Sequence, residues 1–357
     1  MRLVSIQSVA EGNILAKNII DYEGRILLRS GVELSERYIN RLSSLGHDVI
    51  FIEDPDFEDV EIGTVVSEET RLEAYKSIKS ITAQIEMGNG LSDDAVDSVK
   101  NIINQMIDEM LYSPDVLSNL TNIRGFDNCT YHHSINTTVI ALVLGIACGL
   151  TNNTLRDLGI GVLMHDVGKI EIPLDILNKN GKLTSEEYEI VKKHSLRGYE
   201  IIKTNEDFSI LSAHVALQHH ERWDGSGYPR KLKKDGIHLF GRIAAVSDVY
   251  EALTGKRPYR QALQPYEAYE YILAHAGKQF DPLVVQHFVK KIAVYPTGSG
   301  VRLSNGQKGN VVRQNVDFPS RPIVRAIFGK DNSKLAVPVD YNLATNITLM
   351  IVGIDNS

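Results

Sequence analysis

The sequence has few cysteines, a single tryptophan and no excess of positive charge. Two cysteines among 357 residues, Cys129 and Cys148, are too few for a disulfide framework and are typical of a reducing cytoplasm. The formal net charge is −7 at pH 7, and the pI is about 5.9. This balance argues against nucleic-acid binding over a broad basic surface, but it leaves room for a local basic site that binds a small anion.

Long hydrophobic runs are also missing. The most apolar stretch, TTVIALVLGIACGL at 137–150, is shorter than the roughly 18 residues that suggest a transmembrane helix. The N-terminal MRLVSIQSVAEGN has neither the apolar core nor the cleavage pattern of a signal peptide. We therefore expect a cytoplasmic protein in which 137–150 is a buried core helix.

The first third of the chain predicts a small domain followed by a helical connector. Residues 1–65 have the pattern of an α+β domain, with strands at 24–31 and 48–54 and a helix at 35–46. The helical connector is predicted over residues 66–122. Within it, 92–112 repeats apolar residues on one helical face. Such a helix packs in a core or pairs with a second copy of the chain, and the sequence does not separate these alternatives.

The pattern of the remaining residues predicts a mainly helical domain over 123–292 and a small β domain over 293–357. The β part contains a hairpin at 300–312 with Asn305-Gly306 at its turn. Further strand-like segments follow at 321–328, 334–340 and 346–353. This pattern predicts a small β-barrel or sandwich, so the fold class is multidomain and mainly α.

Histidines concentrate in one part of the helical region. Eight of the eleven lie between residues 132 and 238. Five separate segments place a histidine or an aspartate beside an apolar helical run, and the candidate residues are His133, His165, Asp166, His194, His219, His220 and Asp248. Side chains that project from several helices into one space are the usual metal site of all-α proteins. A single histidine on a helix is more often an ordinary core or surface residue, so it is their number that favours a metal site.

The mixture of imidazole and carboxylate favours iron, manganese, zinc or nickel over magnesium or calcium. Asp166 suits the centre of such a site because its two oxygens can bridge two ions. A pair of ions can lower the pKa of a shared water and stabilise both oxygens of an in-line displacement. Lys169 follows His165 by about one helical turn, so its ammonium can reach the same space and bind a phosphate oxygen.

Four segments, HDVGKIEIP, LNKNGKLTSEEYEIVKKHSLRGYEII, HHERWDGSGYP and RIAAVSDVYEALTGKRPYR, resemble the HD-GYP family of metal-dependent phosphodiesterases, within the HD superfamily. The resemblance covers roughly residues 120–292 and includes an intact Gly227-Tyr228-Pro229. It implies an all-α HD-type catalytic domain over 123–292. Members with intact motifs hydrolyse the bacterial second messenger cyclic di-GMP to pGpG or on to GMP, and some cleave cyclic GMP-AMP.

The same resemblance implies roles for individual residues. One metal is held by His133, His165, Asp166 and Asp248, and a second by Asp166, His194, His219 and His220. Asp166 and Lys169 are the implied catalytic residues, and the implied substrate contacts are Lys169, Tyr228, Arg257 and Arg260. Glu221 and Arg222 are expected to brace the loop, and His132 is expected not to bind metal.

The resemblance is incomplete at Cys129. Some family members have a glutamate four residues before the first histidine, where it serves a third metal, and Cys129 stands at that position here. Cysteine can bind metal as a thiolate, but a small packed side chain is the ordinary alternative. We therefore expect two divalent transition-metal ions, with iron or manganese as the main candidates.

Two other functions remain open. A plain HD phosphohydrolase acts on another nucleotide, such as dGTP or ppGpp, and a catalytically weak domain serves as a cyclic-dinucleotide sensor or docking module. The intact HHERWDGSGYP segment favours the phosphodiesterase. Homodimers and signalling partner proteins are compatible with the sequence, which does not identify them.

Overall fold

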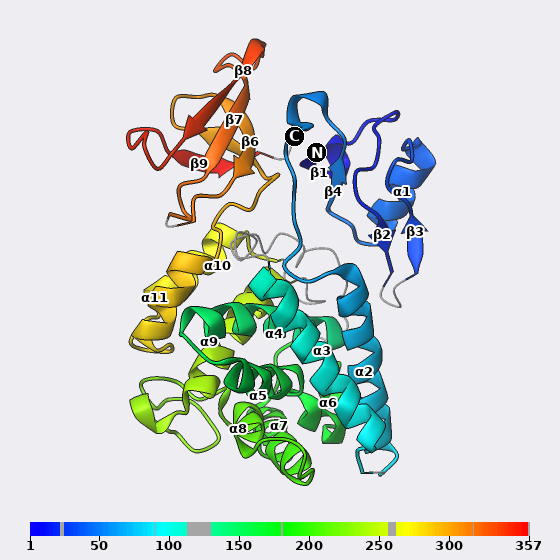
Figure 1. The fold of residues 1–357 in the computed structure, drawn as a ribbon, viewed down its shortest axis with the longest axis vertical. Helices are drawn as coiled ribbons and strands as arrows, with labels where there is room; N and C mark the ends of the chain where they lie inside the picture. The colour runs from blue at the N-terminus through cyan, green and yellow to red at the C-terminus, as the bar shows by residue number, and fades with distance from the viewer. Residues whose placement is uncertain are drawn as a thin grey trace. The chain divides into compact units, whose positions relative to one another are not determined.

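The computed structural model describes residues 1–21, 25–88, 90–112, 130–179, 181–255, 262–316 and 318–355. The chain divides into two compact units (Figure 1). The described residues of the first unit come from Met1–Thr64 and Ile292–Ser357, and those of the second from Val65–Leu117 and Asn128–Lys291. The predicted four-part division of the chain stays a prediction.

The second unit is mainly helical, as the sequence predicts. Its helices are α2 (Glu68–Glu86), α3 (Asp93–Tyr112), α4 (Thr130–Ala147), α5 (Asn152–Leu163), α6 (Leu174–Leu177), α7 (Ser185–Lys203), α8 (Ile210–Gln218), α9 (Leu239–Thr254), α10 (Pro265–Ala274) and α11 (Pro282–Lys291). Among the described residues of this unit, the 3₁₀ helices η5 (Val167–Glu171) and η6 (Lys234–Gly236) lie in the connections. The amphipathic pattern at 92–112 thus corresponds closely to α3.

Local sequence explains where several of these helices begin. The side chain of Thr184 accepts a hydrogen bond from the backbone of Glu187, and the Glu187 carboxylate accepts one from the Thr184 backbone, which forms a capping box at the start of α7. At the start of α5 the side chain of Thr151 accepts a hydrogen bond from the backbone nitrogen of Thr154. Residues 139–144 of α4 are fully buried, which confirms the predicted core helix. No helix among the described residues is long and apolar enough to cross a membrane.

Close packing of η5 on α7 brings the segment after Asp166 against the helix that carries His194. A Cβ atom added at Gly168 would lie 2.1 Å from the carbonyl oxygen of His194 and 2.5 Å from the backbone nitrogen of Gly198. These contacts are with backbone, which cannot rotate away. Glycine at position 168 therefore allows the segment after Asp166 to approach α7.

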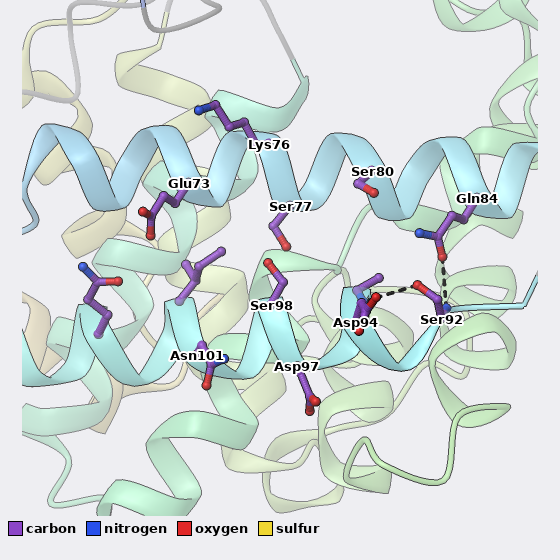
Figure 2. Close-up of a pocket in the computed structure, with 13 residues that line it drawn as sticks. Glu73, Lys76, Ser77, Ser80, Gln84, Ser92, Asp94, Asp97, Ser98 and Asn101 are labelled. Atoms are coloured by element: carbon purple, nitrogen blue, oxygen red, sulfur yellow. Dashed lines mark hydrogen bonds between the residues drawn. The ribbon is translucent and has the colours of Figure 1, made fainter.

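A polar groove runs between α2 and α3 (Figure 2). Ser77 and Ser98 face it from opposite helices, and near one end the backbone nitrogen of Ser92 donates a hydrogen bond to the side chain of Gln84. The groove shares no residue with the candidate metal ligands.

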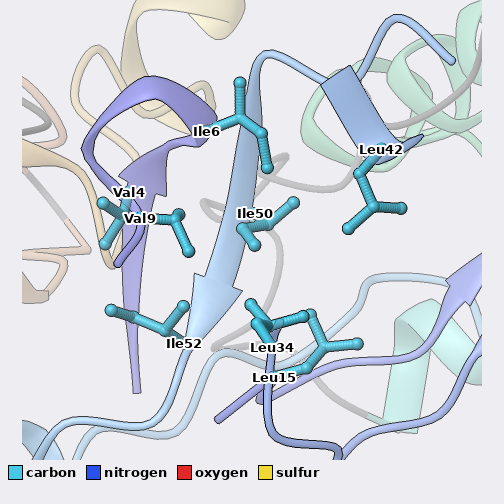
Figure 3. Packing of buried hydrophobic residues seen from close by; sticks show 8 residues of the cluster. All are labelled: Val4, Ile6, Val9, Leu15, Leu34, Leu42, Ile50 and Ile52. Atoms are coloured by element: carbon cyan, nitrogen blue, oxygen red, sulfur yellow. The ribbon is translucent and has the colours of Figure 1, made fainter. Parts of the chain in front are cut away.

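The N-terminal part of the first unit combines short strands with one helix. Strand β1 (Arg2–Ser5) pairs antiparallel with β4 (Val49–Ile52), and β2 (Ile19–Ile20) pairs with β3 (Ile26–Leu28). Helix α1 (Glu36–Ser44) and the 3₁₀ helices η1 (Ile6–Ser8) and η2 (Pro55–Phe57) complete it. Figure 3 shows the buried cluster of Val4, Ile6, Val9, Leu15, Leu34, Leu42, Ile50 and Ile52. A separate α+β domain here stays a prediction.

The C-terminal part of the first unit is a five-stranded antiparallel sheet. Its strands are β5 (Gly300–Leu303), β6 (Lys308–Arg313), β7 (Ile323–Phe328), β8 (Lys334–Asn342) and β9 (Ile351–Ile354), in the order β8-β7-β6-β5-β9. The predicted hairpin is present, and Gly306 adopts a φ of +87° at its turn. The predicted barrel or sandwich is not confirmed: β9 pairs with β5, which leaves β8 and β9 as the two edges of an open sheet.

The contact at Gly168 predicts the effect of adding one methyl group. We expect Gly168→Ala to lower the free energy of unfolding by about 2–3 kcal/mol, or roughly 5–10 °C in the midpoint, because overpacking forces η5 and α7 apart. Thermal unfolding followed by circular dichroism measures this change. Gly236→Ala is the matched control, since a Cβ there meets nothing within 4 Å. Equal midpoints for the two variants would contradict the prediction.

Candidate metal centre

The seven predicted ligands, which come from five segments, converge in the second unit. His133 projects from α4, His165 and Asp166 lie between α5 and η5, His194 projects from α7, His219 and His220 follow α8, and Asp248 projects from α9. All are buried except His220, which is half-buried. Their nitrogen and oxygen atoms form three groups, within each of which all lie within 4.8 Å of one another: His133, His165 and Asp166; His165, His219 and Asp248; His194, His219 and His220.

Asp166 lies between two pairs of imidazoles. Its Oδ2 is 3.8 Å from Nε2 of His133 and 3.5 Å from Nε2 of His165. Its Oδ1 is 3.6 Å from Nε2 of His194 and 3.9 Å from Nε2 of His219. These separations are too long for hydrogen bonds. They are close to the roughly 3.4 Å expected between two ligands that each lie about 2.1 Å from a shared ion in tetrahedral geometry.

Backbone carbonyls orient three of the imidazoles. Nδ1 of His165 lies 2.7 Å from the carbonyl oxygen of Val162, and Nδ1 of His194 lies 2.6 Å from that of Val191. Nδ1 of His219 is likewise 2.8 Å from the carbonyl oxygen of Ala216. A carbonyl only accepts, so each Nδ1 carries the proton and each Nε2 presents a lone pair to the centre. Such contacts set the tautomer and direction of metal-binding histidines.

A carboxylate orients the fourth imidazole. Nδ1 of His133 makes a short hydrogen bond with Glu251, which lies one turn after Asp248 on α9 and is buried. Nε2 of His133 is 3.0 Å from Oδ1 of Asp248. Although burial lowers the pKa of His133, the carboxylates of Glu251 and Asp248 raise it to about 10.

Sequence reasoning did not identify Glu251. The available signal was its position three residues after Asp248, on the same face of a predicted helix.

Burial and charge set the protonation of the other groups. Burial lowers the pKa of His219 well below its usual range and that of His220 to about 3. For Asp166, burial raises the pKa, but Lys169 and the surrounding histidines outweigh it and hold the pKa well below its usual range. Neutral imidazoles and ionised carboxylates are the forms that bind metal ions. At neutral pH most of the cluster therefore has the protonation states that metal binding requires.

Two atoms at the centre support a cation site directly. Nε2 of His165 and Oδ1 of Asp166 are buried and have no hydrogen-bond partner within the described part of the chain. Buried polar groups in native proteins nearly always have a partner. With neighbouring donors that are all nitrogen or carboxylate oxygen, these residues fit divalent transition metals. The assignment of individual ligands stays a prediction.

The predicted substrate-contacting residues Lys169 and Tyr228 lie beside this cluster. Nζ of Lys169 is 2.5 Å from Oδ2 of Asp166, and its side chain is partly exposed. The ring of Tyr228 lies 4.7 Å from that of His220, centroid to centroid. Glu221 accepts hydrogen bonds from the backbone nitrogens of Arg230 and Leu232, so it holds the chain that follows Tyr228.

Other predicted residues lie apart from the cluster or outside the described residues. His132 belongs to none of the three groups, and its ring stacks on that of Tyr75 with centroids 5.1 Å apart. Arg257, Arg260 and Cys129 lie outside the described residues. Cys148 is a free thiol, and burial raises its pKa to about 11.

The contact between His133 and Glu251 predicts a loss of metal affinity. We expect Glu251→Gln to weaken metal binding about 10- to 100-fold, because an amide orients the imidazole less strongly and makes it less basic. Competition with a chromophoric chelator measures the affinity. Glu200→Gln, an exposed change at a glutamate that pairs with Arg197, serves as the control and should bind metal as the wild type does. Unchanged affinity in Glu251→Gln would show that the contact plays no part in holding metal.

Comparisons with known proteins identify relatives of this chain. A model of the HD domain matches residues 107–284, and a model of the KOW domain associated with the HD domain matches residues 300–357. The chain is 34% identical to cyclic di-GMP phosphodiesterase PA4108 of Pseudomonas aeruginosa. The alignment spans 265 residues and covers 74% of this chain and 63% of the relative. It is also 34% identical to 3′3′-cGAMP-specific phosphodiesterase 2 of Vibrio cholerae. This alignment spans 198 residues and covers 54% of this chain and 38% of the relative.

A solved structure shows a related fold. Bd1817, a HDG"Y"P protein from Bdellovibrio bacteriovorus, aligns with a TM-score of 0.52 at 16% identity and covers 80% of this chain and 97% of its own. The chain spans less than two thirds of the length of the two curated relatives. The HD-domain match, the curated relatives and the converging histidines and aspartates lead to one conclusion: residues 107–284 of this chain are an HD domain of the HD-GYP family.

Proposed function

We propose that this chain is a metal-dependent phosphodiesterase that hydrolyses cyclic di-GMP to pGpG, with GMP as the product when the second diester is also cleaved. The observation that carries the proposal is the position of Asp166, whose two oxygens face two different pairs of buried imidazoles. This is the arrangement expected of a carboxylate that bridges two ions. The similarity to cyclic di-GMP phosphodiesterase PA4108 supports the choice of substrate.

The proposed ligands divide at Asp166. His133, His165 and Asp248 would hold the first ion together with Asp166, and His194, His219 and His220 would hold the second together with the same carboxylate. Mixed imidazole and carboxylate donors suit iron or manganese. Two such ions, when bound, supply a water of lowered pKa and neutralise charge that develops on the phosphoryl oxygens.

The protein's own side chains position the phosphodiester. The ammonium of Lys169, placed beside Oδ2 of Asp166, donates a hydrogen bond to a phosphoryl oxygen and offsets its charge. Tyr228, Arg257 and Arg260 contact the nucleotide. Hydrolysis adds water across one P–O3′ bond and leaves a 5′-phosphate and a free 3′-hydroxyl.

A second substrate has specific support. Because a relative is named as a 3′3′-cGAMP-specific phosphodiesterase, cyclic GMP-AMP is the main competitor for the same site. An assay with cyclic di-GMP, 3′3′-cGAMP, dGTP and ppGpp, analysed by chromatography on anaerobically purified protein with counted metals, separates the candidates. Faster cleavage of dGTP or ppGpp supports the alternative of a plain HD phosphohydrolase, and tight binding of a cyclic dinucleotide without turnover supports the sensor.

The bridging position of Asp166 predicts the effect of its removal. We expect Asp166→Ala to lose both bound ions and to reduce hydrolysis of cyclic di-GMP to background, because each ion loses a ligand and the charge that balances it. Metal analysis and chromatography of the products measure the two losses. Asp235→Asn is the control, since this aspartate is 87% exposed and lies outside the cluster. Hydrolysis by Asp166→Ala at the wild-type rate would overturn the assignment.

A further inference from the structure

A row of aromatic side chains leads away from the candidate metal centre. Starting from the proposed ligand His220, the ring of Tyr228 lies 4.7 Å away at an interplanar angle of 33°. The ring of Tyr188, on α7, lies 6.2 Å beyond it and nearly perpendicular, at 81°. Tyr228 is half-buried, whereas Tyr188 is 45% exposed. The row therefore starts at the buried cluster and ends at the surface.

A positive charge accompanies the outer part of this row. Lys192 lies one turn after Tyr188 on α7, and its Nζ is 4.6 Å from the centre of the Tyr188 ring and 5.6 Å from that of Tyr228. The same ammonium pairs with Glu189 at 2.6 Å. Cation–π contacts of this length hold an ammonium over aromatic faces. Lys192 is thus positioned at the two tyrosines while it keeps donors for a further partner.

We propose that Tyr188 and Lys192 form a subsite for the purine base of the nucleotide whose phosphodiester lies at the histidine and aspartate cluster. The inference rests on the proposed function and adds to it the residues that recognise the base. A purine presents a broad π face, which a partly exposed tyrosine ring stacks on. The O6 and N7 atoms of guanine are acceptors, which an ammonium binds.

The position of the pair suits a base rather than a phosphate. In a nucleotide the ribose separates the base from its phosphate, so base contacts lie beside the phosphate site and not within it. Tyr228 fills the interval between His220 and Tyr188. Lys169 already places a positive charge at Asp166, where the phosphodiester binds. The surface end of the row thus complements the nucleotide with aromatic area and one ammonium.

Steady-state kinetics with two diesters test the tyrosine. Bis(p-nitrophenyl) phosphate contains a phosphodiester but no purine, so it reports on the metal centre alone. We expect Tyr188→Leu to raise the KM for cyclic di-GMP about 5- to 100-fold. The increase for bis(p-nitrophenyl) phosphate should be much smaller, and kcat should change little. Tyr188→Phe, which retains the aromatic face, should have the wild-type KM for cyclic di-GMP.

A second variant tests the lysine. We expect Lys192→Met to reduce the preference for cyclic di-GMP over cyclic di-AMP about 5- to 100-fold, because adenine presents an amino donor where guanine presents the O6 acceptor. Competition between the two cyclic dinucleotides in one reaction measures this preference. An unchanged preference would remove Lys192 from the subsite.

The same helix supplies a matched control. Tyr199 and Lys203 have the same spacing on α7, with Nζ of Lys203 5.6 Å from the ring centre. Tyr199 packs against His214, which is not one of the proposed ligands. Tyr199→Leu should therefore leave both KM values at wild-type levels. If Tyr188→Leu and Tyr199→Leu behave alike, or if Tyr188→Leu impairs both diesters equally, the base subsite is wrong.

Calorimetric binding of cyclic di-GMP separates this inference from the proposed function. Wild-type protein that binds cyclic di-GMP without hydrolysing it would overturn the phosphodiesterase. The subsite would then be supported by weaker binding in Tyr188→Leu and overturned by equal binding. Wild-type protein that neither binds nor cleaves cyclic di-GMP overturns both.

Discussion

The structure of the metal centre depends on one buried, ionised carboxylate. Asp166 is 5% exposed, and burying a single charge costs several kcal/mol unless opposite charge or metal surrounds it. Lys169 provides part of that compensation at 2.5 Å. Cations bound between the carboxylate and the imidazoles that face its two oxygens would provide the remaining compensation of its charge. The groups that surround this carboxylate come from five segments of the chain. The fold of the helical unit must therefore bring these segments together for the buried charge to be stable.

Burial and neighbouring charge together set the protonation of the two kinds of proposed ligand. Burial lowers the pKa of His194 and His219, which favours their neutral forms. It would raise the pKa of Asp166, but positive charge and the neighbouring imidazoles outweigh it. Helix-borne carbonyls and Glu251 then fix the directions of the rings. Because these acceptors lie on helices packed against one another, little reorganisation is needed when an ion binds.

The arrangement separates chemistry from recognition. On our proposal, the buried cluster would contact the phosphodiester, which every cyclic dinucleotide shares. On our proposal the base is recognised further out, at Tyr188 and Lys192, where side chains are partly exposed. Such a division allows related enzymes to differ in substrate without a change in the metal ligands. It is consistent with the naming of relatives of this chain for both cyclic di-GMP and 3′3′-cGAMP.

The sequence by itself determined the helical pattern, the hairpin at Asn305-Gly306 and the identity of the residues that converge, because periodicity, turn preference and motif order are local properties of the chain. It did not determine that Glu251 holds His133 or that the C-terminal sheet is open. These features depend on contacts between residues far apart in the chain, such as the approach of Gly168 to the backbone of His194. Only tertiary packing decides them.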